Sequence, residues 1–236
     1  PLAHQPGTKW HYGWSIDVLG YLIEVLTGKR FDAFLKERLF EPLGMVDTDF
    51  WVPPEKAGRL ASLYGPAEPQ YQPEGTLRVQ RTPGLKALES ASESAYLRPK
   101  EFLSGGGGLV STIDDYYRFA QMLVNKGELG GERILGRKTV ELMSMNHMPP
   151  SMLPFTDWAT CRGYGFGLGV RVLVDVAQAG RLGSVGNYGW DGAASTFFWV
   201  DPVEDLTAIT LPQHIPNTGF PHAQDFVVAV YQALVD

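Results

Sequence analysis

The 236-residue chain has little of what secreted, membrane-embedded or nucleic-acid-binding proteins depend on. Its single cysteine, Cys161, cannot form a disulfide within the chain, which favours a reducing, cytoplasmic compartment. A lone nucleophilic thiol is the alternative role for that residue. No apolar run reaches the roughly 18 residues of a membrane span, and no signal segment opens the chain. With a net charge of −6 and scattered Lys and Arg, we expect neither nucleic acid nor a membrane as a partner.

Several catalytic signatures are missing as well. The five histidines show no His-Glu-x-x-His pair and no carboxylate at ligand spacing, so we expect no metal site. The segment Ser104–Thr112 contains four glycines but neither the Lys-Ser/Thr of a phosphate loop nor the spacing of a dinucleotide fingerprint. We therefore expect no cofactor. The absence of Gly-x-Ser-x-Gly excludes the nucleophile elbow of the α/β-hydrolases.

Hydrophobic periodicity predicts an α+β fold with an antiparallel sheet and flanking helices. Helices are predicted over residues 16–27, 31–39, 112–125, 137–146 and 223–234, the first with Ser15 as N-cap and Gly28 at its end. Period-two stretches predict strands over residues 163–174, 189–202 and 206–211. Prolines interrupt residues 50–104, where we expect only a short strand near Thr76–Gln80. We expect solvated or dipole-opposing carboxylates at Glu24, Asp114 and Asp115.

The stretch from Gly189 to Pro202 has the most informative pattern. Glycines stand on both sides of Trp190-Asp191, and aromatic and β-branched residues follow. Glycine at the start of a strand lets another group come close to the backbone, so we expect a ligand there. Asp201-Pro202 ends the strand, because proline has no N–H to give to the sheet. This segment is thus predicted to be one strand that begins at a binding site.

Four stretches of the chain follow one another in a characteristic order. They are Trp10-His11-Tyr12-Gly13-Trp14-Ser15-Ile16-Asp17, Pro42-Leu43-Gly44-Met45 with Asp47-Thr48, Gly105–Thr112, and Gly189–Pro202. Together they resemble the landmarks of the β-lactamase-related serine hydrolases. The similarity is greatest to the family VIII carboxylesterases, the esterase branch that resembles class C β-lactamases and penicillin-binding proteins. The resemblance implies one β-lactamase/transpeptidase-like domain over residues 1–236.

The resemblance also implies roles for particular residues. In this family the serine of a Ser-x-x-Lys box attacks an acyl carbon, while the lysine and the tyrosine of a Tyr-x-Asn box move its proton. Tyr12 matches that tyrosine. Trp190-Asp191-Gly192 matches the Lys-Thr-Gly box that lines the site, and the backbone N–H of Ala193 would donate to the oxyanion.

Two positions depart from the family pattern. Trp14 replaces the asparagine of the second box, and Trp190 replaces the lysine of the third. A lysine would meet the carboxylate of a β-lactam or a peptide, so an indole favours neutral, apolar ester substrates. Less specific roles remain open, with Trp190 as a pocket wall and Asp191 as an exposed residue. The Gly105–Gly108 run is either a lead-in to a helix or a loop next to substrate.

The largest departure is the missing nucleophile box. No serine or threonine stands three residues before any lysine of the chain. An isolated tyrosine has a pKa near 10, so without that lysine we expect Tyr12 to be a poor base. We therefore expect a domain that lacks its N-terminal part, with apolar surface covered by the missing segment or by self-association. The alternatives are a non-catalytic β-lactamase-like binding protein and a β-lactamase or D-Ala-D-Ala peptidase.

Overall fold

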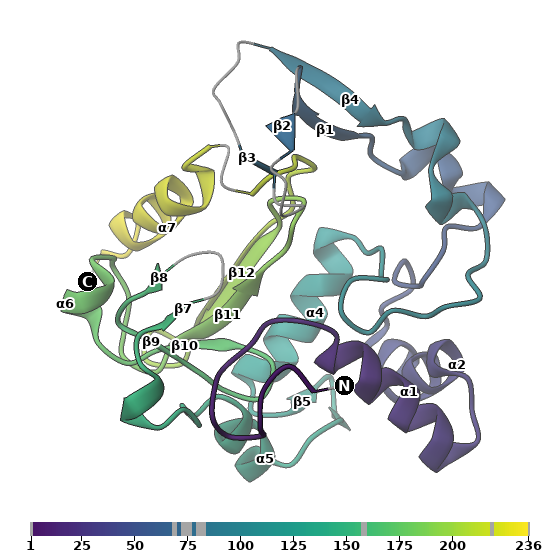
Figure 1. The fold of residues 1–236 in the computed structure, drawn as a ribbon. Coiled ribbons are helices and arrows are strands. Elements are labelled where there is room, and N and C mark those ends of the chain that lie inside the picture. The colour runs from purple at the N-terminus through teal and green to yellow at the C-terminus, as the bar shows by residue number, and fades with distance from the viewer. Residues whose placement is uncertain are drawn as a thin grey trace.

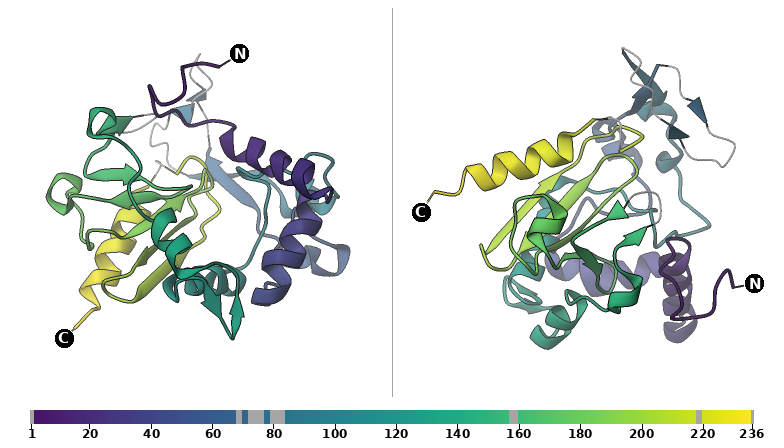
Figure 2. Two further views of the ribbon diagram at one scale, coloured as in Figure 1. Left: turned by 90° about the horizontal axis from the view of Figure 1, so that it is seen from below. Right: turned by 60° about the vertical axis from the view of Figure 1, so that its left-hand side comes forward.

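The centre of the molecule is a five-stranded antiparallel sheet in the order β13-β12-β11-β10-β9 (Figure 1). The computed structural model describes residues 2–67, 70–71, 77–78, 84–156, 160–217 and 220–235. The strands of the sheet are β9 Tyr164–Phe166, β10 Arg171–Leu173, β11 Tyr188–Asp191, β12 Phe197–Asp201 and β13 Leu206–Thr210. Helices α4 (Ile113–Val124) and α7 (His222–Gln232) cover its two faces, which gives three layers (Figure 2).

The two cores meet at β12, whose five residues are all buried. Phe198 and Val200 belong to the cluster that includes Met122 of α4. Phe197 and Trp199 pack instead with Val227 of α7. Because successive side chains of a strand point to opposite faces, this alternation places β12 between the two helical layers. The fold is thus α+β, with a central antiparallel sheet and helices on both of its faces, as the sequence predicts.

The predicted helices are confirmed, with differences at their ends. The remaining helical segments are α1 Ser15–Thr27, α2 Phe31–Leu35, the π-helical η1 Lys36–Phe40, α3 Glu41–Leu43, α5 Arg137–Met143, α6 Val176–Ala179 and the 3₁₀ turns η2 Pro54–Arg59, η3 Ala91–Glu93, η4 Ala95–Leu97 and η5 Pro150–Met152. The N-cap assignment of Ser15 is wrong, because Trp14 holds that position without a side-chain cap. Gly28 ends α1 with a left-handed φ of 67°. The second helix continues past its expected end to Leu43, since Pro42 lies in the first turn of α3, where its missing N–H is tolerated.

The expected single sheet is wrong for the described residues, which also form four two-stranded sheets. These pair β1 Leu63–Pro66 with β4 Leu85–Glu89, β2 Gln70–Tyr71 with β3 Leu77–Arg78, β5 Glu128–Leu129 with β6 Glu132–Arg133, and β7 Phe155–Thr156 with β8 Thr160–Cys161. Of the strand expected near Thr76–Gln80, β3 is described, and the other residues lie outside the described part of the chain.

Two predicted long strands are in fact hairpins. Residues 163–174 form β9 and β10, joined by a turn in which the Gly167 N–H donates to the Val170 carbonyl at 2.7 Å. Residues 189–202 form most of β11 and all of β12, joined by a turn in which the Gly192 N–H donates to the Thr196 carbonyl at 2.8 Å. Side-chain alternation continues on both sides of a tight turn, so the period-two pattern does not reveal the reversal.

Asp201 does more than end a strand. Its carboxylate is fully buried and accepts hydrogen bonds from the backbone N–H groups of Ser184, Val203 and Glu204 at 3.1 to 3.3 Å. The hydroxyl of Tyr231 on α7 donates to the same carboxylate at 2.6 Å. Burial and the neighbouring Asp201 both raise the pKa of Tyr231, which therefore stays a protonated donor. This carboxylate fastens α7 to the sheet.

A second buried carboxylate explains the Asp47-Thr48 landmark. Asp115 is 3% exposed and therefore not solvated, but it lies in the first turn of α4, as the alternative expectation of a dipole-opposing carboxylate requires. It accepts hydrogen bonds from the Asp47 N–H at 2.6 Å and from the Thr48 hydroxyl at 2.8 Å. Hydrogen bonds from Arg59 and Lys56 lower the pKa of Asp47 to about 2. The landmark is therefore a structural joint between this loop and the start of α4.

The glycine-rich segment packs against the first turn of α1. The Ser104 hydroxyl donates to the Asp17 carboxylate at 2.5 Å, and the Gly106 N–H donates to it at 3.4 Å. None of the four glycines has a positive φ. At Gly105 the requirement is close approach, because a Cβ there would lie 2.6 Å from the Ile16 carbonyl oxygen. The loop therefore fixes the start of α1, directly after the segment that carries Tyr12 and Trp14.

We expect Gly105→Ala to lower the free energy of unfolding by about 1–3 kcal/mol, because the added methyl would force the loop and α1 apart. Gly107→Ala is the matched control, since a Cβ at Gly107 would meet nothing within 4 Å. Urea denaturation of both variants checks the prediction. Equal stabilities would show that the loop does not depend on this close approach.

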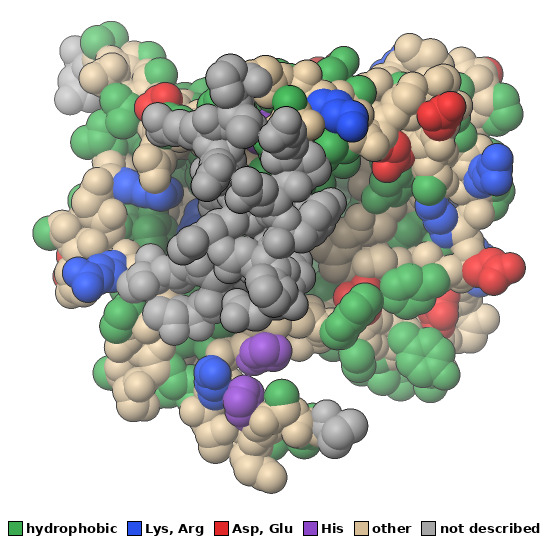
Figure 3. Space-filling view, turned by 45° about the horizontal axis from the view of Figure 1, so that its top comes forward, with side chains coloured by type: hydrophobic (Ala, Val, Ile, Leu, Met, Phe, Trp, Pro, Cys, Tyr) green, Lys and Arg blue, Asp and Glu red, His purple; other side chains and the backbone are tan. Residues whose placement is uncertain are grey.

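Helix α1 leaves much of its apolar stripe at the surface. Leu19 is 51% exposed, Val25 60% and Leu26 75%, whereas Gly20 is buried against Phe31. Hydrophobic side chains reach the surface over this part of the molecule (Figure 3). An apolar patch of this kind commonly marks a surface that another segment or protein covers.

Candidate active site

Tyr12 and Trp190, which belong to the first and the last of the four landmark stretches, stack on each other. Their ring centroids lie 5.9 Å apart with an interplanar angle of 12°. Tyr12 comes from the segment before α1, and Trp190 comes from β11 of the central sheet. The fold thus brings together side chains from opposite ends of the chain. Tyr12 is 41% exposed, so its ring can be reached from solvent.

Three further aromatic residues hold this pair, and the sequence did not single them out. Phe166 of β9 meets Trp190 edge-on, with centroids 5.3 Å apart and an angle of 88°. Trp10 packs on Phe166 at 5.3 Å and on Phe155 at 4.7 Å. Edge-to-face and tilted pairs of this kind are each worth about 0.5–1.5 kcal/mol beyond burial. One feature of the sequence could have pointed to this aromatic cluster, namely Trp10 in the same landmark stretch as Tyr12.

Asp191 is held by two neighbours and is not a freely exposed carboxylate. Its Oδ1 lies 3.4 Å from a guanidinium nitrogen of Arg171, and its Oδ2 accepts from the Asn217 amide at 2.9 Å. Arg171 also lies over the rings of Tyr164 and Trp190, at 4.9 and 5.7 Å from their centroids. Cation–π contacts of this kind add to the packing of Trp190. Arg171 was missed, although it is the one charged residue in the stretch 164–174.

The glycines of the stretch from Gly189 to Pro202 have structural roles. A Cβ at Gly189 would collide with the Phe198 carbonyl oxygen and the Trp199 Cα of β12. The expectation that a ligand approaches the strand at Gly189 is therefore wrong, because the neighbouring strand does so. Gly192 belongs to the β11–β12 turn. Ala193 is exposed in the same turn, and its N–H has no hydrogen-bond acceptor among the described residues.

Trp14 is not brought into the cluster. It is 73% exposed, and within the described ranges its ring stacks on no other aromatic group.

The turn after Ala193 is stabilised by two histidines. The buried Ser195 hydroxyl donates to the His214 carbonyl at 2.6 Å, and His222 lies 3.0 Å from the Ser195 carbonyl oxygen. Ser195 has a left-handed φ of 69° in this turn.

The part of the chain that the structure describes holds no group of three His, Cys, Asp or Glu residues that could bind a metal. Within the same ranges, no helix has the length and apolar character needed to cross a bilayer.

Burial raises the pKa of the Cys161 thiol, an effect that the nearby Arg171 partly offsets. A protonated thiol is a weak nucleophile, so the geometry favours the Tyr12 region as the candidate site.

The chain matches the model of the Beta-lactamase family over residues 1–232. It is 33% identical to Protein Rv1367c of Mycobacterium tuberculosis over 225 residues, which cover 92% of this chain and 52% of that protein. Esterase EstB of Burkholderia gladioli is 30% identical over 227 residues, with 89% of this chain and 51% of the esterase covered. A protein of Escherichia coli K12 that is provisionally named a D-alanyl-D-alanine carboxypeptidase is 25% identical over 251 residues, with 100% and 54% covered.

Among solved structures, EstCE1, a hydrolase with promiscuous acyltransferase activity, superposes with a TM-score of 0.76 at 23% identity. The match covers 97% of this chain and 57% of EstCE1, and it confirms the fold. The chain spans about half the length of the curated relatives it matches. The family match and these relatives show that the chain belongs to the β-lactamase family. Its relatives there include esterases and penicillin-binding-protein-like serine hydrolases.

Proposed function

We propose that the protein of which this chain forms part is a serine carboxylesterase that works through an acyl-enzyme. The observation that carries the proposal is the stacked pair of Tyr12 and Trp190. Ala193 lies in the turn that follows the strand of Trp190, and its N–H has no hydrogen-bond acceptor among the described residues. A phenol that can move a proton and a donor that can stabilise an oxyanion are two of the three groups that such a reaction needs.

In the proposed reaction, Tyr12 acts as a phenolate that the ammonium of the Ser-x-x-Lys lysine stabilises. A serine hydroxyl attacks the ester carbonyl carbon, and its proton passes to the Tyr12 oxygen. The negative charge that develops on the carbonyl oxygen is stabilised by the N–H of Ala193 and by that of the nucleophile. The C–O bond to the alcohol then breaks, and Tyr12 returns the proton to the leaving oxygen. Water attacks the acyl-enzyme in the same way and releases the carboxylic acid.

The nucleophile would come from outside these 236 residues, because no Ser-x-x-Lys occurs within them. The relatives are about twice as long as the matched region, so a protein of their length has room for that box. The exposed stripe of Leu19, Val25 and Leu26 on α1 supports a segment that docks there and completes the site.

An ester substrate fits the surroundings of Trp190 better than a β-lactam. The strand position that carries lysine in the β-lactamases presents an indole here, packed by Phe166 and Tyr12. Arg171, whose guanidinium carbon lies 5.7 Å from the centroid of the Trp190 ring, already faces the Asp191 carboxylate. A substrate carboxylate would therefore lose water without gaining a full ionic partner.

A comparison of p-nitrophenyl butyrate with nitrocefin tests this proposal in the complete protein. We expect kcat/KM to be about 10- to 100-fold higher for the ester, because a charge-assisted hydrogen bond to the β-lactam carboxylate, worth about 1.5–3 kcal/mol, is missing. Trp190→Lys should lower the ratio of kcat/KM for p-nitrophenyl butyrate to kcat/KM for nitrocefin. Faster turnover of nitrocefin would favour a β-lactamase, and turnover of neither by a folded protein would favour a binding protein.

A further inference from the structure

The hairpin turn between β11 and β12 explains why the N–H of Ala193 is not used by the sheet. The Ser195 N–H donates to the Gly192 carbonyl at 3.0 Å, and the Gly192 N–H donates to the Thr196 carbonyl at 2.8 Å. With its left-handed Ser195, this is the three-residue hairpin loop in which a tight turn is followed by a bulge. Ala193 is the first residue of the loop, so its N–H takes part in neither of these bonds.

Asp191 is the last residue of β11 and stands two positions before Ala193. Its Oδ1 lies 3.4 Å from Arg171 of β10, the strand on one side of β11. Its Oδ2 accepts from the amide of Asn217 at 2.9 Å, and Asn217 follows β13, which lies beyond β12 on the other side. The carboxylate therefore connects the two sides of the sheet at the end where the turn lies.

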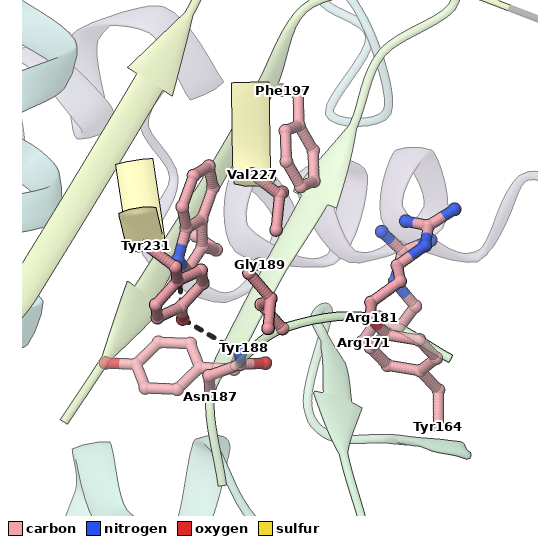
Figure 4. A pocket seen from close by; sticks show the side chains of 11 residues that line it. Tyr164, Arg171, Arg181, Asn187, Tyr188, Gly189, Phe197, Val227 and Tyr231 are labelled. Atoms are coloured by element: carbon pink, nitrogen blue, oxygen red, sulfur yellow. Dashed lines mark hydrogen bonds between the residues drawn. The ribbon is translucent and has the colours of Figure 1, made fainter. Parts of the chain in front are cut away.

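The side chain of Arg171 is itself fixed by two aromatic rings. Its guanidinium lies 4.9 Å from the centroid of the Tyr164 ring (Figure 4) and 5.7 Å from that of the Trp190 ring. The side chains of Arg171 and Asp191 are only 17% and 24% exposed. A partly buried ion pair is screened by salt less than an exposed one. Arg171 thus holds the Asp191 carboxylate in a defined place beside Trp190.

The segment that contains Asn217 is also bound to the far side of the turn. The His214 N–H donates to the Ala194 carbonyl at 3.1 Å, and the Ser195 hydroxyl donates to the His214 carbonyl at 2.6 Å. Residues 214–217 therefore bind the hairpin both before and after Ala193. A hairpin loop fixes its own shape, but these bonds fix where the loop stands relative to the rest of the domain.

We infer that Asp191 is a positioning residue, which holds the backbone at Ala193 so that its N–H meets the oxyanion. The inference rests on the proposed ester hydrolysis. Both oxygens of the carboxylate are engaged by protein groups, so Asp191 acts through the turn and not on the substrate. Such alignment matters because an oxyanion donor stabilises the transition state only when it is held in place beforehand, and loss of one donor costs about 10²- to 10³-fold in kcat.

Kinetics of Asp191→Ala with p-nitrophenyl butyrate test the inference in the complete protein. We expect kcat to fall about 10- to 100-fold while KM changes less than about threefold, because the misplaced donor acts on charge that develops in the transition state. Asp191→Asn keeps one acceptor oxygen and should recover part of kcat. Glu132→Ala, which removes an exposed carboxylate from β6, is the control and should retain the kcat of the unaltered protein.

A second measurement, ¹⁵N relaxation of the Ala193 amide, needs no turnover. We expect an order parameter of about 0.85 in the unaltered protein and below about 0.6 in Asp191→Ala. An unchanged order parameter together with an unchanged kcat would overturn the inference. A raised KM at constant kcat would also overturn it, since Asp191 would then contact the substrate. Absence of ester turnover in the unaltered protein would refute the esterase proposal, whereas the order parameter would still decide whether Asp191 fixes the turn.

Discussion

Replacing Tyr12 with phenylalanine is expected to lower kcat/KM for p-nitrophenyl butyrate by about 10²- to 10⁴-fold in the complete protein, because the group that moves the proton is lost. The phenylalanine ring keeps the stacking on Trp190, whose centroid lies 5.9 Å away. Stability should therefore change by less than about 0.5 kcal/mol. Initial rates over a range of substrate concentrations, together with urea denaturation, measure both quantities.

Tyr21→Phe is the matched control for this experiment. Tyr21 lies on α1 and is 67% exposed. Its substitution by phenylalanine removes a phenolic hydroxyl group from the same region of the chain. Its variant should retain the activity of the unaltered protein. Full activity of Tyr12→Phe would contradict the role of the phenol, whereas an equal loss in both variants would point to a general effect on α1.

The second large effect concerns stability. Asp201→Ala should lower the free energy of unfolding by about 3–5 kcal/mol, because three backbone N–H groups and the Tyr231 hydroxyl lose a buried, charged acceptor at once. Asp201→Asn keeps one acceptor oxygen and should restore part of the loss. Denaturation followed by tryptophan fluorescence also reports on Trp199, which bonds to the same tyrosine.

Glu204→Ala is the control for Asp201, since Glu204 is exposed and lies in the same turn. We expect a change within about 0.5 kcal/mol for that variant. If Asp201→Ala changed the free energy of unfolding as little as Glu204→Ala, α7 would be held to the sheet by the apolar contacts of Val227 and not by the carboxylate. The two variants thus separate the polar joint from the hydrophobic one.

The helices could be predicted because their signals are local. Gly28 ends α1, and the Thr112 hydroxyl caps α4 by accepting from the Asp115 N–H at 3.3 Å. The hairpins could not, because period-two alternation is the same before and after a turn. The turn at residues 192–196 depends on a left-handed backbone conformation at Ser195, which cannot be predicted from the residue type because serine rarely adopts it.

For the site, the resemblance identified Tyr12 and Trp190, and the structure places their rings in contact. It gave no indication that Trp14 lies outside the cluster. The pairing of Arg171 with Asp191 depends on which residues of β10 and β11 stand opposite each other. The burial of Asp115 likewise depends on a partner loop distant in sequence. Such contacts are set by tertiary register, which a single sequence leaves open.

The central claim is that this chain supplies the proton-transfer half of an acyl-enzyme esterase, and trapping the intermediate tests it most directly. The complete protein, mixed with p-nitrophenyl butyrate and quenched in acid, is examined by intact-protein and peptide mass spectrometry. We expect the mass of one butyryl group on a serine outside these 236 residues, with slower accumulation in Tyr12→Phe. Ester turnover without a covalent acyl group, or an acyl group on Cys161, would contradict the account.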